Sequence, residues 1–367
     1  MTFAPRLAWL AMAGVVGALV LTGVGVCVGS TGFENLLLPL LNPMLAPEQT
    51  AIAQQIVWDI RLPRTLGAWA AGALLGLAGA VAQGIFRNPL ADPFLLGSAS
   101  GASLGVALAL AALGGGAGML GGFGGIGSVG SVGSGIAFSV FSSSVWVRLG
   151  LTGAAFLGAV LAVLLTLALS RGVGHTLRLL LAGVVVGVVL SALTHLVLLF
   201  SPDSMQAMQA FMLGSTAFVG WTSALLMAAV WAVASLAAWL LARVLDGLSL
   251  GDATALSLGL PVAPMRTALV AVLALATGTA VAQTGLIAFV GLAAPHLVRA
   301  WVKTTHGTLL LLSSLVGGVL LMAADILARG LMAPQELPVG VLTAVLGGGY
   351  LLWLMHRGPG QVAGSGV

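Results

Sequence analysis

Long apolar runs, broken by short polar segments, cover most of this chain of 367 residues. A helix needs about 20 predominantly apolar residues to cross the hydrocarbon core of a bilayer. The pattern predicts ten spanning helices, at roughly 7–29, 65–85, 94–113, 149–169, 178–200, 220–242, 266–283, 285–300, 308–328 and 338–355. The segment 285–300 is the shortest, so we expect it to tilt or to cross only part of the bilayer.

Composition supports this pattern and excludes a soluble protein. The chain is 59% hydrophobic and only 6% charged, whereas a soluble domain carries about 25% charged residues. A β-barrel would show alternating segments of about 10 residues, but these runs are continuous. We therefore expect an all-α integral membrane protein, with one transmembrane domain over 1–367. The first apolar core, 7–28, is longer than that of a usual signal peptide and predicts a spanning helix.

The basic residues set the expected orientation, because cytoplasmic loops of membrane proteins carry an excess of Lys and Arg. With the N-terminus inside, nine of the 13 lie on the cytoplasmic side: Arg6, Arg87, Arg171, Arg178, Arg243, Arg266, Arg299, Lys303 and Arg357. The other four, Arg61, Arg64, Arg148 and Arg329, then lie outside. We expect both termini to be cytoplasmic. Because the basic residues are scattered between apolar runs, they do not indicate a nucleic-acid partner.

Two sequence features depart from plain apolar spans. The segment 114–144 is rich in Gly and Ser, and we expect it to form an extracytoplasmic loop. The tetrapeptide "AVAQ" occurs at 80–83 and again at 280–283, near opposite ends of two spans, which suggests an inverted repeat. Its glutamines, Gln83 and Gln283, either bond neighbouring helices or line a translocation path, and the sequence leaves both readings open.

The sequence shows little sign of catalytic chemistry. It contains no H-E-x-x-H, Cys-x-x-Cys or G-x-S-x-G motif, so we expect no catalytic residue, no metal site and no cofactor. Its one cysteine, Cys27, cannot form an internal disulfide. Asp325 and Arg329 are four residues apart in one predicted helix and are expected to pair. An ion-coupled secondary transporter is disfavoured, because it would need titratable groups near the bilayer midplane.

The loop 244–265 is too polar to span a membrane and lies on the predicted cytoplasmic side. Asp252 is placed to cap a short helix there. Such a helix, held between two spans, either docks into a partner or simply connects the spans.

These residues stand in motifs that resemble the permease subunit of type II ABC importers. The motifs are "RLPRTL" at 61–66, "GAVAQGIFRNPLADPFLLGSASGASLG" at 79–105, "GDATALSLGL" at 251–260, "GLIAFVGLAAPHLVR" at 285–299 and "ELPVGVLTAVLG" at 336–347. The resemblance implies ten spans, with spans two to five and seven to ten related by an inverted repeat. The segment 114–144 departs from the family pattern because it is longer than the usual connection.

The resemblance also implies partners and a function. It implies a homodimer in the bacterial inner membrane, with two cytoplasmic ATP-binding subunits and a periplasmic substrate-binding protein. The expected function is ATP-driven import of a bulky metal chelate, either an iron–siderophore complex or haem, with cobalamin as the alternative. The permease would be non-catalytic, with ATP hydrolysis in the separate subunits.

By the same resemblance, two sets of residues would face these partners. Arginines on the outer surface would pair with acidic side chains of the binding protein, and they match Arg61, Arg64 and Arg329; the alternative is that they anchor at lipid headgroups. The coupling helix that seats in the ATPase subunit matches Gly251, Asp252, Ala253, Ala255, Leu256, Leu258, Gly259 and Leu260.

Overall fold

A computed structural model describes residues 3–30, 32–36, 47–114, 145–170 and 176–356. The first part contains α1 (Phe3–Cys27), β1 (Val28–Gly29), β2 (Gly32–Phe33), α3 (Pro47–Gln55), the π-helix η1 (Ile56–Arg61), α4 (Leu62–Phe86), the 3-10 helix η2 (Pro93–Leu96) and α5 (Ser98–Gly114). The strands β1 and β2 form one short antiparallel hairpin. The Gly- and Ser-rich loop lies outside the described residues, apart from its first residue.

The second part is also helical. It contains α7 (Val145–Leu169), α8 (Thr176–Phe200), the 3-10 helix η3 (Pro202–Ser204), α9 (Met205–Leu213), α10 (Trp221–Leu240), α11 (Ala242–Ser249), α12 (Asp252–Ser257), α13 (Val262–Thr284), α14 (Val290–Trp301), α15 (His306–Gly330) and α16 (Val339–His356). Each of the ten segments that the apolar pattern predicts therefore contains a helix.

Seven helical stretches among the described residues are long and apolar enough to cross a membrane. They are α1, the continuous stretch Thr50–Phe86, α7, α8, α10, α13 and α15; α5 and α16 are shorter apolar helices. The twelve residues of α14 rise about 18 Å at 1.5 Å per residue. That length is less than the roughly 30 Å of the hydrocarbon core, so α14 crosses only part of it.

The eighth predicted segment also begins later than the apolar pattern suggests. Residues 285–289 are not helical, and α14 starts only at Val290. Gly285 has a φ of 70°, and Phe289, directly before the helix, has a φ of 68°. These left-handed conformations interrupt the helix although the side chains remain apolar. Because the residues are apolar on both sides of this break, hydropathy alone could not locate it.

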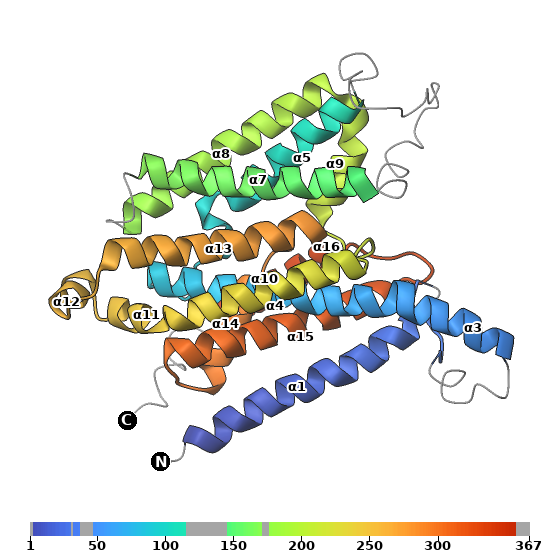
Figure 1. Ribbon diagram of the computed structural model, residues 1–367, viewed down its shortest axis with the longest axis horizontal. Helices are drawn as coiled ribbons and strands as arrows, with labels where there is room; N and C mark the ends of the chain where they lie inside the picture. The colour runs from blue at the N-terminus through green and yellow to red at the C-terminus, as the bar shows by residue number, and fades with distance from the viewer. Residues whose placement is uncertain (1–2, 31, 37–46, 115–144, 171–175, 357–367) are drawn as a thin grey trace.

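Helix α4 lies at the centre of the bundle, between α10, α13, α14 and α15 (Figure 1). Almost all of its side chains are buried. Small residues allow the close approach: an added Cβ on Gly72 would lie 2.3 Å from the carbonyl oxygen of Gly317 in α15. Backbone contact at this distance leaves no room for a side chain, so α4 and α15 pack as one unit.

The packing of α4 and α13 is reciprocal. In the first half of the chain α4 packs against α14 and α15 of the second half, whereas α13 of the second half packs against α5 and α7 of the first. The two helices also contact each other. This exchange is what an inverted repeat of spans two to five and seven to ten produces.

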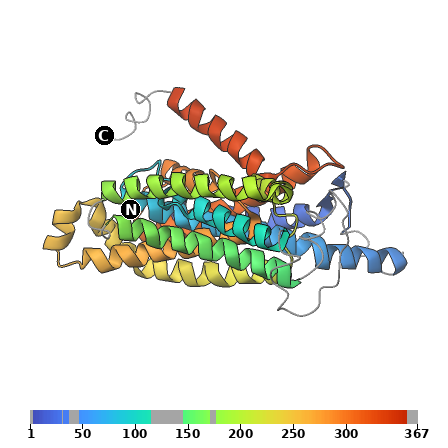
Figure 2. The ribbon, with the colours of Figure 1, turned by 90° about the horizontal axis from the view of Figure 1, so that it is seen from above.

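The two ends of the bundle differ. The beginning of α1 lies at the end that carries α11 and α12, and α3 projects at the opposite end (Figure 1). Helix α16 runs away from the bundle, toward the α12 end (Figure 2). The described residues thus form a helical bundle with different segments at its two ends.

Candidate functional site

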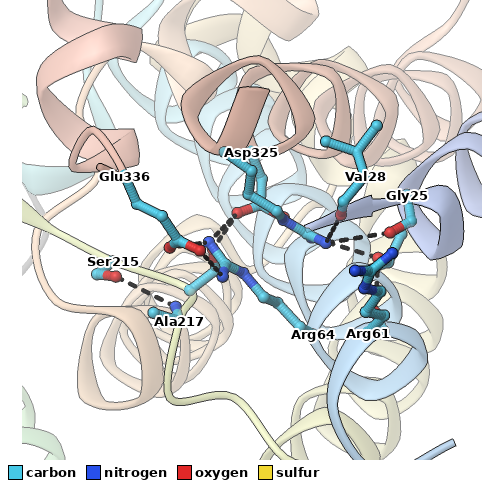
Figure 3. A network of polar contacts seen from close by, with 11 residues as sticks. Gly25, Val28, Arg61, Arg64, Ser215, Ala217, Asp325 and Glu336 are labelled. Carbon is cyan, nitrogen blue, oxygen red and sulfur yellow. Dashed lines mark hydrogen bonds and ion pairs between the residues drawn. The ribbon is translucent and has the colours of Figure 1, made fainter. Parts of the chain in front are cut away.

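A cluster of charged residues, most of them buried, lies at the end of the bundle opposite α12. We call it the arginine cluster, and it consists of Arg61, Arg64, Asp325, Arg329, Glu34 and Glu336. Figure 3 labels Arg61, Arg64, Asp325 and Glu336. Three separate parts of the chain supply it: the loop after the β-hairpin, the junction of η1 with α4, and the end of α15 with the segment after it.

Asp325 is the centre of this cluster. Its side chain is 0% exposed, and its carboxylate pairs with Arg64 at 3.2 Å and with Arg329, one helical turn further along α15. The hydroxyl of Thr216, in the loop before α10, also donates to it. A buried charge is stable only when it is paired and hydrogen-bonded, and Asp325 meets both conditions. The predicted pair of Asp325 with Arg329 is confirmed.

The arginines have further partners within the chain. Arg64 reaches Glu336 at 2.9 Å. Arg61 reaches Glu34 at 2.5 Å and donates to the carbonyl of Val26 at 3.0 Å. Arg329 donates to the hydroxyl of Thr65 and to the carbonyls of Gly25 in α1 and Val28 in β1. The cluster therefore ties α1, α4 and α15 together.

The structure does not expose these arginines as the sequence suggested. Arg61, Arg64 and Arg329 are 6%, 8% and 1% exposed. Acids of the same chain lie in contact with all three arginines. The more accessible members of the cluster are Glu34 and Glu336, whose side chains are 42% and 25% exposed. A role of the arginines in docking a binding protein stays a prediction.

The α12 end carries the loop 244–265, which we call the coupling segment. Gly251, with a φ of 104°, is the N-cap residue of α12, and Asp252 is the first residue inside the helix. The N-cap residue is thus Gly251 and not Asp252, so the predicted capping role of Asp252 is wrong. Its carboxylate instead pairs with Arg266 at 2.9 Å and with Arg87 at 3.3 Å.

The outer face of this segment exposes three leucines. Leu250, Leu256 and Leu258 are 64%, 61% and 63% exposed, whereas Ala255 is buried against the bundle. Ala253 and Gly259 are also exposed, and Leu260 is partly covered. Helix α11, before it, packs Val244, Leu245 and Leu248 into the core. The segment is therefore fixed on one side and presents leucines on the other.

Sequence reasoning missed Asp246, which fixes α11 to the start of α15. Its carboxylate accepts the backbone N–H of His306 at 3.0 Å and lies 2.7 Å from the Nδ1 atom of the same residue. A carboxylate at a helix N-terminus is favoured because the first N–H groups of the helix lack partners within it. The 60 residues between the two positions hid this contact from the sequence.

The two glutamines have different surroundings. Gln83 is buried, donates to the carbonyl of Leu292 at 3.3 Å and accepts from Arg299. That contact ties α4 to α14, which is the helix–helix reading. Gln283 instead lines a cavity of about 200 Å³. Uncharged polar and apolar residues complete its lining, among them Thr152, Thr222 and Phe211.

No group of three or more His, Cys, Asp or Glu side chains that could hold a metal ion occurs within the described residues. His195, in α8, is exposed and its ring lies 2.8 Å from the carbonyl oxygen of Ser191.

The model of the FecCD transport family matches residues 16–357. The chain belongs to this family. A permease of the iron chelatin transport system of Helicobacter pylori is 35% identical over 327 residues, which cover 89% of this chain and 90% of that protein. The vitamin B12 import system permease BtuC of Pectobacterium atrosepticum is 38% identical over 309 residues, covering 83% of this chain and 84% of that one.

Solved structures agree with this assignment. A metal-chelate type ABC transporter in an inward-facing conformation matches with a TM-score of 0.74 and 27% identity, covering 97% of this chain and 100% of that chain. PsaBC of Streptococcus pneumoniae matches with a TM-score of 0.50 and 20% identity, over 81% of this chain and 92% of that one, and shares the fold. The FecCD permease is thus a multi-pass membrane protein with the fold of type II ABC importers, as the motifs predicted.

Proposed function

We propose that this FecCD permease is the membrane subunit of an ATP-driven importer of a metal chelate, either an iron–siderophore complex or haem. It acts in the bacterial inner membrane as a homodimer with both termini in the cytoplasm. Two ATPase subunits bind at the α12 end, and a periplasmic binding protein delivers the chelate at the arginine-cluster end. The permease hydrolyses nothing itself, since ATP hydrolysis belongs to the separate subunits.

The coupling segment is the observation that carries this proposal. Its exposed leucines offer an apolar contact to a partner, and the helices on either side of it reach the core of the bundle. An ion-coupled transporter working alone would have no use for such a surface. The family relation supports the same assignment.

The cavity beside Gln283 supports the need for a second copy. Its volume is about 200 Å³, and pockets that enclose drug-sized ligands measure about 300–1,000 Å³. This cavity alone therefore offers too little room for a bulky chelate, and a path between two subunits can supply the rest. Its uncharged lining suits brief contacts with a passing ligand that the binding protein holds tightly.

Transport by the purified complex tests the proposal. The permease and its ATPase are reconstituted in vesicles with the cognate binding protein loaded with ferric siderophore, haem or cobalamin. We expect ATP-dependent uptake of an iron chelate and none without the ATPase. Cobalamin is the second candidate, because BtuC relatives are similar to this chain to a comparable degree. Uptake driven by an ion gradient in ATP-free vesicles would contradict the importer assignment.

Docking at the arginine cluster can be tested through its acids. If acidic side chains of the binding protein pair with Arg64, they compete with Glu336 of the permease. Glu336→Gln removes this competition and then raises the affinity for the binding protein severalfold. The measurement is made at low salt, because salt screens electrostatic contacts and weakens them. Unchanged or lower affinity in a folded variant would leave the cluster with a structural role only.

A further inference from the structure

Two carboxylates of the coupling segment are bound to the ends of three core helices. Asp252 holds Arg266 in the first turns of α13 and Arg87 directly after α4. Asp246 holds His306, the first residue of α15. The segment between α10 and α13 thus contacts α4, α13 and α15 through charged groups, in addition to its apolar packing.

Helix α12 has little other attachment. Among its six residues only Ala255 is buried, so apolar packing alone leaves this helix free to shift. Hydrogen bonds between charged groups are shorter and about twice as strong as neutral ones. Arg266 is almost completely buried, so its guanidinium is a fixed point for Asp252. Arg87 is the C-cap residue of α4, in a left-handed conformation with a φ of 51°, and its backbone N–H donates to the carbonyl of Gln83.

The three helices lead to the other end of the bundle. α4 packs against both α13 and α15 along its length, and α4 and α15 carry Arg64 and Asp325 of the arginine cluster. A displacement of the coupling segment therefore acts directly on the helices that reach the opposite face.

From these contacts we propose that Asp252, together with Arg87 and Arg266, is a positioning joint that transmits movement of the ATPase-bound segment to α4 and α13. Asp246 with His306 gives the same attachment to α15. The inference rests on the proposed function, since it names the residues by which that importer couples ATP use to transport. Neither carboxylate touches the transported ligand.

The first experiment measures coupling. Asp252→Asn keeps the shape of the side chain and removes its charge. In complexes of the variant that assemble with the ATPase, we expect the amount of chelate moved per ATP hydrolysed to fall at least fivefold. Asp203→Asn, at an exposed acid between α8 and α9, is the matched control and should leave this ratio unchanged. An unchanged ratio in Asp252→Asn, or a loss confined to ATPase assembly, would overturn the joint.

Arg87→Gln is the second variant, because Arg87 is partly exposed and its loss leaves no buried charge. If the joint works as one unit, the double variant Arg87→Gln with Asp252→Asn loses no more coupling than the worse single variant. If the two losses of coupling add fully, the residues of the joint do not act as one unit.

The second experiment does not depend on the chelate. Hydrogen exchange is followed in the permease–ATPase complex on addition of a non-hydrolysable ATP analogue. We expect a change at the start of α13 that shrinks at least threefold in Asp252→Asn, while the change within α12 persists. Equal changes in both complexes would overturn the joint, even where uptake assays succeed. If the unchanged complex imports no chelate but still shows the transmitted change, the proposed substrate fails and the joint stands.

Discussion

At the scale of single residues, the buried carboxylate of Asp325 depends on its ion-pair partners. It is fully buried near the end of α15 and is held by two arginines and a threonine hydroxyl. Removing one partner of a buried ion pair costs more than the pair contributes, because the remaining charge stays buried without compensation.

Asp325→Asn should therefore destabilise the permease by about 3–5 kcal/mol, the range observed for broken buried pairs. The control is Asp203→Asn, at an exposed acid between α8 and α9, which should change stability by about 0.5 kcal/mol or less. Thermal unfolding of both variants in the same detergent measures the difference. Equal stability of the two variants would show that burial does not govern this cluster.

Residue contacts were predictable from sequence only over short separations. The pair Asp325–Arg329 follows from helical spacing, but Arg64 and Asp325 are 261 positions apart. One sequence carries no signal for that contact. The expectation that Arg61, Arg64 and Arg329 face a partner protein rests on the family resemblance alone. The position of Asp252 before a short helix likewise indicates a helix cap. Its carboxylate instead pairs with the distant Arg87 and the nearer Arg266.

At the scale of elements, the helices were accessible from sequence because apolar length alone specifies them. What hydropathy could not show is backbone conformation inside an apolar run, as at Phe289, or the π-helix η1 that continues directly into α4. Hydropathy also does not show how closely α4 packs, because its glycines contact the backbones of two other helices.

A methyl group at Gly79 should separate α4 from α14. An added Cβ would lie 1.7 Å from the carbonyl oxygen of Gly291, so the helices must move apart. Gly79→Ala should lower stability by at least 1–3 kcal/mol, about the cost of overpacking a core. Thermal unfolding provides the measurement.

Gly153→Ala, in α7, is the control for this change. An added Cβ there meets nothing within 4 Å, and Ala favours a helix over Gly by about 1 kcal/mol. The control should therefore be neutral or stabilising. Equal loss in both variants would contradict the close packing of α4 with α14.

At the scale of the whole molecule, the two ends of the bundle should face different compartments. Cys27 is the one cysteine of the chain, so Cys27→Ser provides a background for single cysteines. A cysteine at Leu258, which is exposed beside α12, should react with an impermeant thiol reagent only from the cytoplasmic side. A cysteine at Gln335, exposed between α15 and α16, should react only from outside. Labelling of both positions from one side would contradict the proposed topology.

The ion pairs at the start of α4 form at different times during synthesis of the chain. Arg64 leaves the ribosome long before its acids, because Asp325 and Glu336 follow it by 261 and 272 residues. At about 5–20 residues per second, the guanidinium waits on the order of 10–50 s for them. Glu34 precedes Arg61 by only 27 residues, so that contact can form as the segment emerges. The centre of this bundle is thus completed late, and a nascent chain that stalls before α15 leaves α4 without its ion pairs and without its packing partner.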